Sequence, residues 1–223
     1  MPSTASPRIR RIEEHVRRVL AEQVAHDYKH VDRVRRWAVQ IADAEGYPDL
    51  ELVEAAALLH DIGLPYAPER RLHGEVGAEV AVAFLRSCDL FVEGEVAEIA
   101  RAVAYHNTLH EGLGPLADIV RDADILDLLG AVGIMRAFTS KAALPEYDPA
   151  NIKGATWRLT ARQFDARFQE GLGIGAHITD QINFQISCYD NLNTAAARQW
   201  GRPLAAYMRD FLRQLACEIE LEP

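Results

Sequence analysis

The stretch AAALLHDIG, residues 55–63, constrains the fold more than any other part of this chain. An apolar helix runs here directly into His60 and Asp61, an imidazole beside a carboxylate. When such side chains are buried they lose hydration, and a hydrogen bond, an ion pair or a metal ion must offset that loss. Two ligands do not hold a catalytic metal ion, so a metal site requires further ligand-type residues in other apolar helices.

Composition limits the partners of the chain. Its 223 residues, 49% of them hydrophobic, are typical of a soluble globular protein. The net charge of −9 argues against a nucleic acid polymer or an anionic membrane as a partner, but it permits a small anionic substrate. We find no signal peptide and no run near the roughly 18 apolar residues of a membrane span, so we expect a cytoplasmic protein. Three cysteines without a CxxC pair suggest neither disulfides nor a thiolate metal site.

Apolar residues that recur at three- and four-residue steps predict helices throughout and no strands, so the fold class is all-α. The expected helices cover residues 8–23, 27–45, 49–61, 73–85, 93–106, 116–129 and 130–143. Residues 144–176 are rich in Gly and Pro but contain aromatic residues, and we expect an ordered excursion over one face. A long helical tract from His177 is expected to break or kink near Trp200, ahead of Gly201 and Pro203, and to continue as a last helix.

Further ligand-type residues do occur in other apolar helices. His30 lies near the first turn of its helix, and Asp124 falls among the buried positions of another. Together with His60 and Asp61 they provide nitrogen and oxygen donors. Such a mixed set suits Zn, Mn, Fe, Co or Ni rather than the all-oxygen cage that Ca prefers.

These ligand-type residues occur in the order His, His-Asp, Asp, within the sequence segments HVDRV, LLHDIG and DADILD. This pattern resembles the motifs of the HD superfamily of metal-dependent phosphohydrolases. The segment GAVGIMR further on is similar to the small bacterial HD-domain hydrolases of that superfamily. The resemblance implies one domain over residues 1–223. Its HD-domain helical bundle would occupy about 26–136, with additional C-terminal helices over about 144–223. The resemblance also implies four metal ligands: His30, His60, Asp61 and Asp124.

The resemblance leaves open whether the site holds one ion or two. His73 and His106 resemble the extra histidines of HD proteins that bind two ions, in which case Asp61 could bridge them. Alternatively, His73 caps its helix and His106 contacts the substrate or supports a ligand. His26 lies four residues before His30 and could overlook the same site, but it and His110 are interpreted as surface histidines rather than ligands.

The implied reaction is hydrolysis of a small phosphorylated substrate, a nucleotide or another phosphoester, by metal-activated water. Asp61 or a neutral His106 would accept the water proton. Arg33, three residues past the first histidine ligand, would contact phosphate or pair with a carboxylate. Asp122 and Asp127 are interpreted as surface carboxylates or as supports for the ligands.

Two other functions remain open on the sequence alone. Some HD proteins with the extra histidines are di-iron oxygenases, and the same residues would then bind iron that activates O₂. The other alternative is a non-catalytic, metal-stabilised domain that senses a ligand.

Two further features have alternative interpretations. In the loop PYAPERRL, Arg70 and Arg71 form either a solvated turn, which we favour, or a phosphate clamp at the rim of the site. The apolar stripes of the C-terminal helices either pack on the core or form the interface of a homodimer, and we prefer the homodimer.

Overall fold

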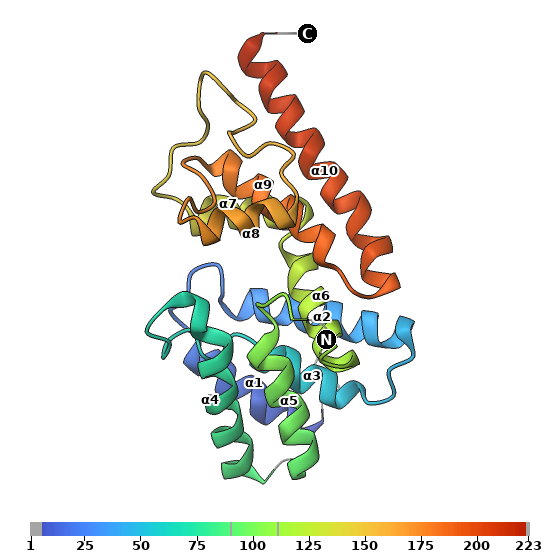
Figure 1. Ribbon diagram of the computed structural model, residues 1–223. Helices are drawn as coiled ribbons and strands as arrows, with labels where there is room; N and C mark the ends of the chain where they lie inside the picture. Colours follow the sequence, from blue (N-terminus) through green and yellow to red (C-terminus); the bar gives the residue numbers. More distant parts are fainter. Residues whose placement is uncertain (1–5, 90, 111, 222–223) are drawn as a thin grey trace. The chain divides into compact units, whose positions relative to one another are not determined.

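The computed structural model describes residues 6–89, 91–110 and 112–221 (Figure 1). Within these ranges every regular element is helical apart from one isolated β-bridge, which confirms the all-α prediction. The α-helices are α1 (Pro7–Val19), α2 (Tyr28–Glu45), α3 (Leu50–Leu59), α4 (His73–Cys88), α5 (Glu93–Tyr105), α6 (Pro115–Asp127), α7 (Gly130–Ser140), α8 (Ala161–Gln169), α9 (Ile178–Ser187) and α10 (Ala195–Glu220). Two short 3-10 helices are η1 (Arg70–Leu72) and η2 (Cys188–Asn191).

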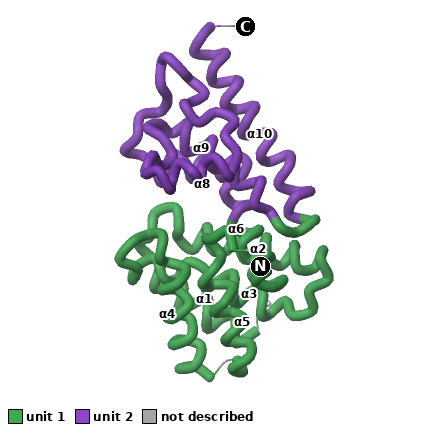
Figure 2. The backbone as a smooth tube through the Cα atoms, in the orientation of Figure 1, with its two compact units in different colours: residues 1–124, 193–196 green, residues 125–192, 197–223 purple. Residues whose placement is uncertain are grey.

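The chain divides into two compact units (Figure 2). The first holds the chain up to Asp124 together with residues 193–196, and the second holds residues 125–192 and the chain from 197 onward. Helix α6 therefore runs from one unit into the other. The sequence predicts a single domain; every residue proposed from it as a metal ligand lies in the first unit.

Helix α3 forms the centre of the first unit. It packs against α1, α2 and α5, and seven of its residues are buried. Asp49 begins the helix as N-cap, because its side chain accepts a hydrogen bond from the amide of Leu52 at 2.9 Å. The helix ends at Leu59, so His60 and Asp61 follow it directly, inside the core rather than at its edge.

The turn after α3 requires glycine at position 63. A Cβ atom there would lie 2.1 Å from the carbonyl oxygen of His73 and 2.4 Å from the amide nitrogen of Gly77. Both atoms belong to the backbone of α4 and cannot move aside as a flexible side chain would. Gly63 therefore allows the turn that carries Asp61 to lie directly against the start of α4.

Helix α2 has the ends that its sequence predicts. The side chain of Asp27 accepts hydrogen bonds from the amides of Lys29 and His30, at 3.1 and 3.2 Å, and begins the helix. Gly46 ends it in the left-handed conformation, with φ of 71°. His30 thus lies in the first turn of a helix whose start is determined by its own sequence.

In the second unit, the carboxylate of Asp180 on α9 organises the excursion of residues 144–176. It accepts hydrogen bonds from the amide and hydroxyl of Thr156, at 3.0 and 2.7 Å, and from the amides of Ala176 and His177, at 3.1 and 3.2 Å. Helix α8 lies within the excursion and buries Phe164. The predicted ordered excursion is therefore present in the structure.

The expected break near Trp200 is wrong. The helical tract instead ends at Ser187, continues as η2, and resumes as α10, which runs through Gly201 and Pro203 without interruption. The break falls earlier because the carboxylate of Asp122 accepts hydrogen bonds from Asn193 and Thr194. Both residues donate through the backbone amide and through the side chain, at 2.7 to 3.1 Å. These contacts hold the two residues just before α10 and define where it begins.

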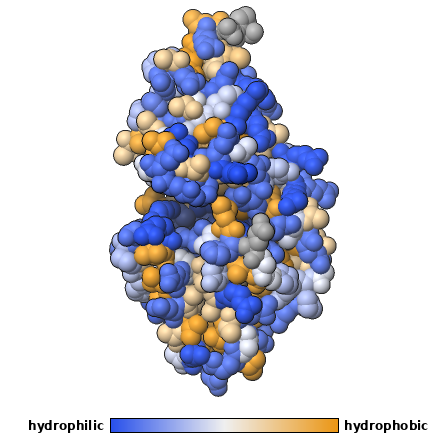
Figure 3. All heavy atoms as spheres, in the orientation of Figure 1, coloured by the Kyte–Doolittle hydropathy of each residue, from blue (hydrophilic) through white to orange (hydrophobic). Residues whose placement is uncertain are grey.

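The described helices include none long and apolar enough to span a membrane. On the face drawn in Figure 3, hydrophobic residues lie in small groups among hydrophilic ones.

Candidate metal centre

Five segments of the first unit bring ligand-type side chains together. α2 carries His30 in its first turn, the end of α3 leads into His60 and Asp61, and α6 carries Asp124. His73 is the first residue of α4, and His106 follows α5. The four histidines and Asp61 are buried, with exposed fractions of 0% for His30, 0% for His60, 1% for Asp61, 8% for His73 and 3% for His106. Ionisable residues this deeply buried require partners or a bound ion.

The carboxylate of Asp61 lies between two groups of imidazoles. Its Oδ2 atom is 3.3 Å from Nε2 of His30 and 3.3 Å from Nε2 of His60. Its Oδ1 atom is 3.2 Å from Nε2 of His73 and 3.6 Å from Nε2 of His106. Asp124 joins the first group, with Oδ1 at 3.5 Å from Nε2 of His30. The two oxygens of one carboxylate thus face two separate sets of donor atoms.

Three of these imidazoles are held by the backbone of their own segment. In each case Nδ1 lies within hydrogen-bonding distance of the carbonyl oxygen three residues earlier. The pairs are His60 with Ala57 at 2.7 Å, His73 with Arg70 at 2.6 Å and His106 with Val103 at 2.8 Å. A carbonyl oxygen only accepts, so each Nδ1 carries the proton, and in the neutral ring Nε2 presents a lone pair toward Asp61.

The distances between these donor atoms fit a bound cation. Nε2 of His73 is 3.0 Å from Nε2 of His106, and Nε2 of His30 is 3.2 Å from Nε2 of His60. The lone pairs of His73 and His106 would repel each other at this separation unless a proton or a metal ion lay between them. For metal–nitrogen distances of about 2.1 Å, neighbouring ligand atoms lie roughly 3.0 to 3.4 Å apart. Three overlapping groups of residues could therefore hold a metal ion: His26 with His30 and Asp61, His30 with His60 and Asp124, and His60 with Asp61 and His106.

The pKa values show how strongly the buried charges interact in the absence of metal. Burial alone would raise the pKa of Asp61, but its interactions with the imidazoles of His60, His26 and His106 lower it well below the usual carboxyl range. Burial likewise opposes charge on His60, yet the carboxylates of Asp61 and Asp124 raise its pKa to about 9. Burial lowers the pKa of His106. Asp61 is therefore a carboxylate, and His106 favours the neutral form.

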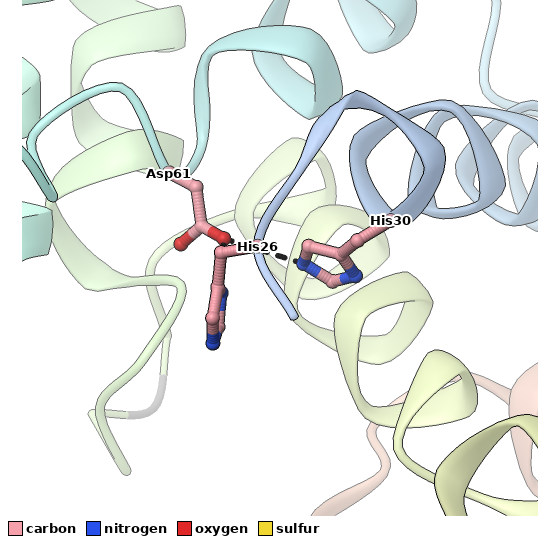
Figure 4. Close-up of side chains that lie close together, drawn as sticks. All are labelled: His26, His30 and Asp61. Carbon is pink, nitrogen blue, oxygen red and sulfur yellow. Dashed lines mark hydrogen bonds and ion pairs between the residues drawn. The ribbon is translucent and has the colours of Figure 1, made fainter. Parts of the chain in front are cut away.

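His26 is the residue of this cluster that sequence reasoning set aside as a surface histidine, and that interpretation is wrong. Its side chain is only 16% exposed, and its Nδ1 lies 2.6 Å from Oδ2 of Asp61. Figure 4 shows His26 and His30 approaching the Asp61 carboxylate from the segment before α2 and from α2 itself. The available signal was its position four residues before His30, immediately ahead of the N-cap of α2.

The remaining sequence-predicted residues have other surroundings. Asp122 and Asp127 are buried, with exposed fractions of 0% and 1%, so neither is a surface carboxylate. Asp122 binds the start of α10, as described above, and Asp127 pairs with Arg136 at 3.0 Å in the second unit. Arg33 is half-buried on α2, and its contact with phosphate stays a prediction. His110 is exposed, as expected.

Comparisons with known proteins bear on the family and the fold of the chain. Residues 27–129 match the HD domain family. YpgQ of Bacillus subtilis, an uncharacterized protein, is 28% identical over 205 residues, which cover 89% of this chain and 86% of YpgQ.

Solved structures resemble the chain over nearly its whole length. The crystal structure of YpgQ in complex with ADP has a TM-score of 0.64 at 25% identity and covers 95% of this chain and 94% of YpgQ. A predicted HD superfamily hydrolase from an uncultured Thermotogales bacterium gives 0.63 at 26% identity, covering 95% of this chain and 93% of that one. An HD-superfamily hydrolase from Bacillus thuringiensis gives 0.63 at 26%, covering 94% and 95%. With its His and Asp donors placed as described, residues 27–129 form an HD domain, and the chain as a whole resembles HD-superfamily hydrolases.

Proposed function

We propose that this protein is a metal-dependent phosphohydrolase that acts on a nucleotide or another small phosphoester. The observation that carries the proposal is the carboxylate of Asp61, whose two oxygens each lie 3.2 to 3.6 Å from a pair of imidazole nitrogens. The crystal structure of YpgQ with ADP supports a nucleotide as the ligand, since that relative covers most of this chain. A bound divalent ion supplies Lewis acidity, which lowers the pKa of coordinated water and polarises a phosphoryl oxygen.

The residues of the chain then have distinct tasks. His30, His60, Asp61 and Asp124 would hold the ion through nitrogen and oxygen atoms. The Asp61 carboxylate, whose pKa is held well below its usual range, is a poor proton acceptor and serves as a ligand. His106, whose pKa burial lowers, keeps a lone pair on Nε2. If the site holds one ion, His106 would be the group that accepts a proton from water.

The same geometry also accommodates two ions. His73 and His106 face Oδ1 of Asp61 and lie 3.0 Å from each other, so they form a second set of donors that share this carboxylate. In that case Asp61 would be a ligand shared by both sets of donors, and His106 would be a ligand rather than a base. The His73 side chain does not cap α4, since no hydrogen bond of that kind is present at the start of the helix.

Metal content and phosphate release test the proposal together. The protein would be purified without chelator, analysed for Mn, Fe, Co, Ni and Zn by mass spectrometry, and assayed for phosphate release from nucleotides and other small phosphoesters. We expect His60→Ala to lose metal and turnover. His73→Ala leaves one ion per chain if the parent holds two and leaves the count unchanged if the parent holds one.

His110→Ala is the matched control, because this histidine is exposed and belongs to none of the three candidate metal groups. A metal-loaded parent that releases no phosphate from any phosphoester would contradict the proposal.

A di-iron oxygenase is the second candidate, because the six candidate ligands, with Asp61 as the shared carboxylate, also suit two iron ions. The metal analysis separates the two functions. Two iron ions per chain, O₂ consumption and no phosphate release would replace the hydrolase with the oxygenase.

A further inference from the structure

Arg70, in the loop before α4, is connected to the candidate metal centre through His26. Its guanidinium Nη2 atom is hydrogen-bonded to Nε2 of His26, and Nδ1 of the same ring lies 2.6 Å from Oδ2 of Asp61. A single imidazole ring therefore separates the guanidinium from the carboxylate at the middle of the site. His26 reaches this position from the loop between α1 and α2, where Ala25 adopts a left-handed conformation with φ of 63°.

The chemistry of Arg70 and Asp61 determines which atoms donate and which accept in the two hydrogen bonds of His26. A guanidinium only donates hydrogen bonds and a carboxylate only accepts them. His26 must therefore accept from Arg70 at Nε2 and donate to Asp61 from Nδ1, as a neutral ring with its proton on Nδ1. In this state His26 fixes the guanidinium of Arg70 at the side of the Asp61 carboxylate.

The remaining donors of Arg70 distinguish it from neighbouring cations. The side chain is exposed, and within the described part of the chain its guanidinium has no partner besides His26. Arg71, the next residue, instead forms an ion pair with Glu69 at 2.7 Å. Lys29 pairs with Asp27 at 3.1 Å. Arg70 thus keeps N–H groups available for an anion beside the site.

We propose that Arg70 binds a phosphate oxygen of the substrate and that His26 is its positioning residue. This inference rests on the proposed phosphohydrolase function. An anionic substrate must approach two carboxylates, Asp61 and Asp124, in a chain of net charge −9, so it requires positive charge beyond the ligands. Guanidinium groups match phosphate geometry and form charge-assisted hydrogen bonds with it.

The width of the imidazole ring determines which phosphate Arg70 contacts. A phosphate that reacts must lie at the donor atoms around Asp61, whereas the guanidinium is one ring farther out. Arg70 is therefore placed for a neighbouring phosphate of the same molecule. The ligand class is accordingly a nucleotide with at least two phosphates, for which ADP is the probe and AMP the comparison.

The test is the dissociation constant of ADP and of AMP, measured by calorimetry on metal-loaded protein. We expect Arg70→Ala to weaken ADP binding about 10- to 100-fold, the range for a hydrogen bond between charged groups, and to affect AMP much less. Arg71→Ala is the matched control, since it removes the same side chain one position away, and it should change neither constant by more than about twofold.

Two variants test the role of His26. His26→Ala should weaken ADP binding while leaving metal content unchanged, and His26→Gln should restore binding, because an amide can accept from Arg70 and donate to Asp61. A loss of metal in His26→Ala would identify the residue as a ligand instead and overturn its positioning role.

The Arg70 inference fails if the parent does not bind ADP, or if Arg70→Ala and Arg71→Ala bind it equally well. Either result is distinguishable from failure of the proposed function, which is measured by phosphate release. A parent that binds ADP through Arg70 but hydrolyses no phosphoester would sustain the binding site and refute the hydrolase.

Discussion

The substitution Asp122→Asn tests whether Asp122 and Asp124, the two aspartates of the segment DAD, have separate tasks. The Asp122 carboxylate is fully buried and accepts hydrogen bonds from the amides and side chains of Asn193 and Thr194, all at 2.7 to 3.1 Å. Asparagine keeps the shape of the side chain but replaces one acceptor oxygen with an NH₂ donor. That NH₂ group would face N–H and O–H groups that are also donors.

The magnitude follows from the hydrogen bonds that are lost. Replacing either oxygen removes at least two of these contacts, and each hydrogen bond to a charged group contributes about 1.5 to 3 kcal/mol. Relief from burying a charge offsets part of this loss, so we expect the free energy of unfolding to fall by about 3 to 5 kcal/mol. For a chain of this size, about 2 to 4 °C of Tm accompanies each kcal/mol, which predicts a decrease of roughly 6 to 20 °C.

Thermal unfolding followed by circular dichroism would measure this decrease, with Asp118→Asn as the control. Asp118 lies one turn earlier on α6, and burial and the charge of Asp122 raise its pKa, so its charged form is not stabilised by the fold. We expect that control to change stability by less than about 1 kcal/mol. Equal Tm values for the two variants would refute the assignment of Asp122 to the anchoring of α10. Asp124→Asn should instead lower metal content with little effect on the metal-free protein.

Three further perturbations have defined outcomes. Gly63→Ala places a Cβ atom 2.1 Å from the backbone of α4, so we expect severe loss of soluble, metal-loaded protein in expression and metal analysis. Asp180→Asn should release the excursion that this carboxylate holds, and limited proteolysis should then cleave within residues 144–176 while the parent resists. Asp27→Ala removes the N-cap of α2 and should cost about 1 kcal/mol in urea unfolding. Burial opposes charge on Asp27, but hydrogen bonds from Lys29 and the helix amides lower its pKa, so its contribution is present above pH about 4 and disappears as the pH falls further. An Asp27→Ala variant that loses as much stability relative to the parent at pH 3 as at pH 7 would contradict that linkage.

The helices and most of the candidate site could be predicted because their signals are local. Apolar spacing marked the helices, and the expected ranges 27–45 and 49–61 agree with α2 and α3 to within two residues at each end. The proposed ligands could be recognised because a polar residue within an apolar helix is conspicuous in the sequence alone. Their convergence on Asp61 is a property of the tertiary fold, but the family resemblance already implied it.

Features that depend on contacts between distant segments could not be predicted in the same way. The start of α10 is defined by a carboxylate 71 residues earlier in the chain, so Pro203 gave a stronger local signal for a break than the true position did. His26 lies in a loop outside any helix, where no periodicity points to its partner. Its contact with Asp61, 35 residues away, is visible only in the folded chain.

The contacts of His60, His73 and His106 with carbonyl groups three residues earlier also bear on protein design. Each of these histidines and the carbonyl that it contacts lie within one four-residue segment at a helix end. The direction of Nε2 is therefore defined within four residues and needs no distant support. Fixing the rotamer of a histidine side chain costs on the order of 1 kcal/mol of conformational entropy. That cost falls when the helix forms rather than when a metal ion binds. Such a four-residue unit is a template that could be transplanted to the ends of unrelated helices, where it would present a preoriented ligand without redesign of the surrounding core.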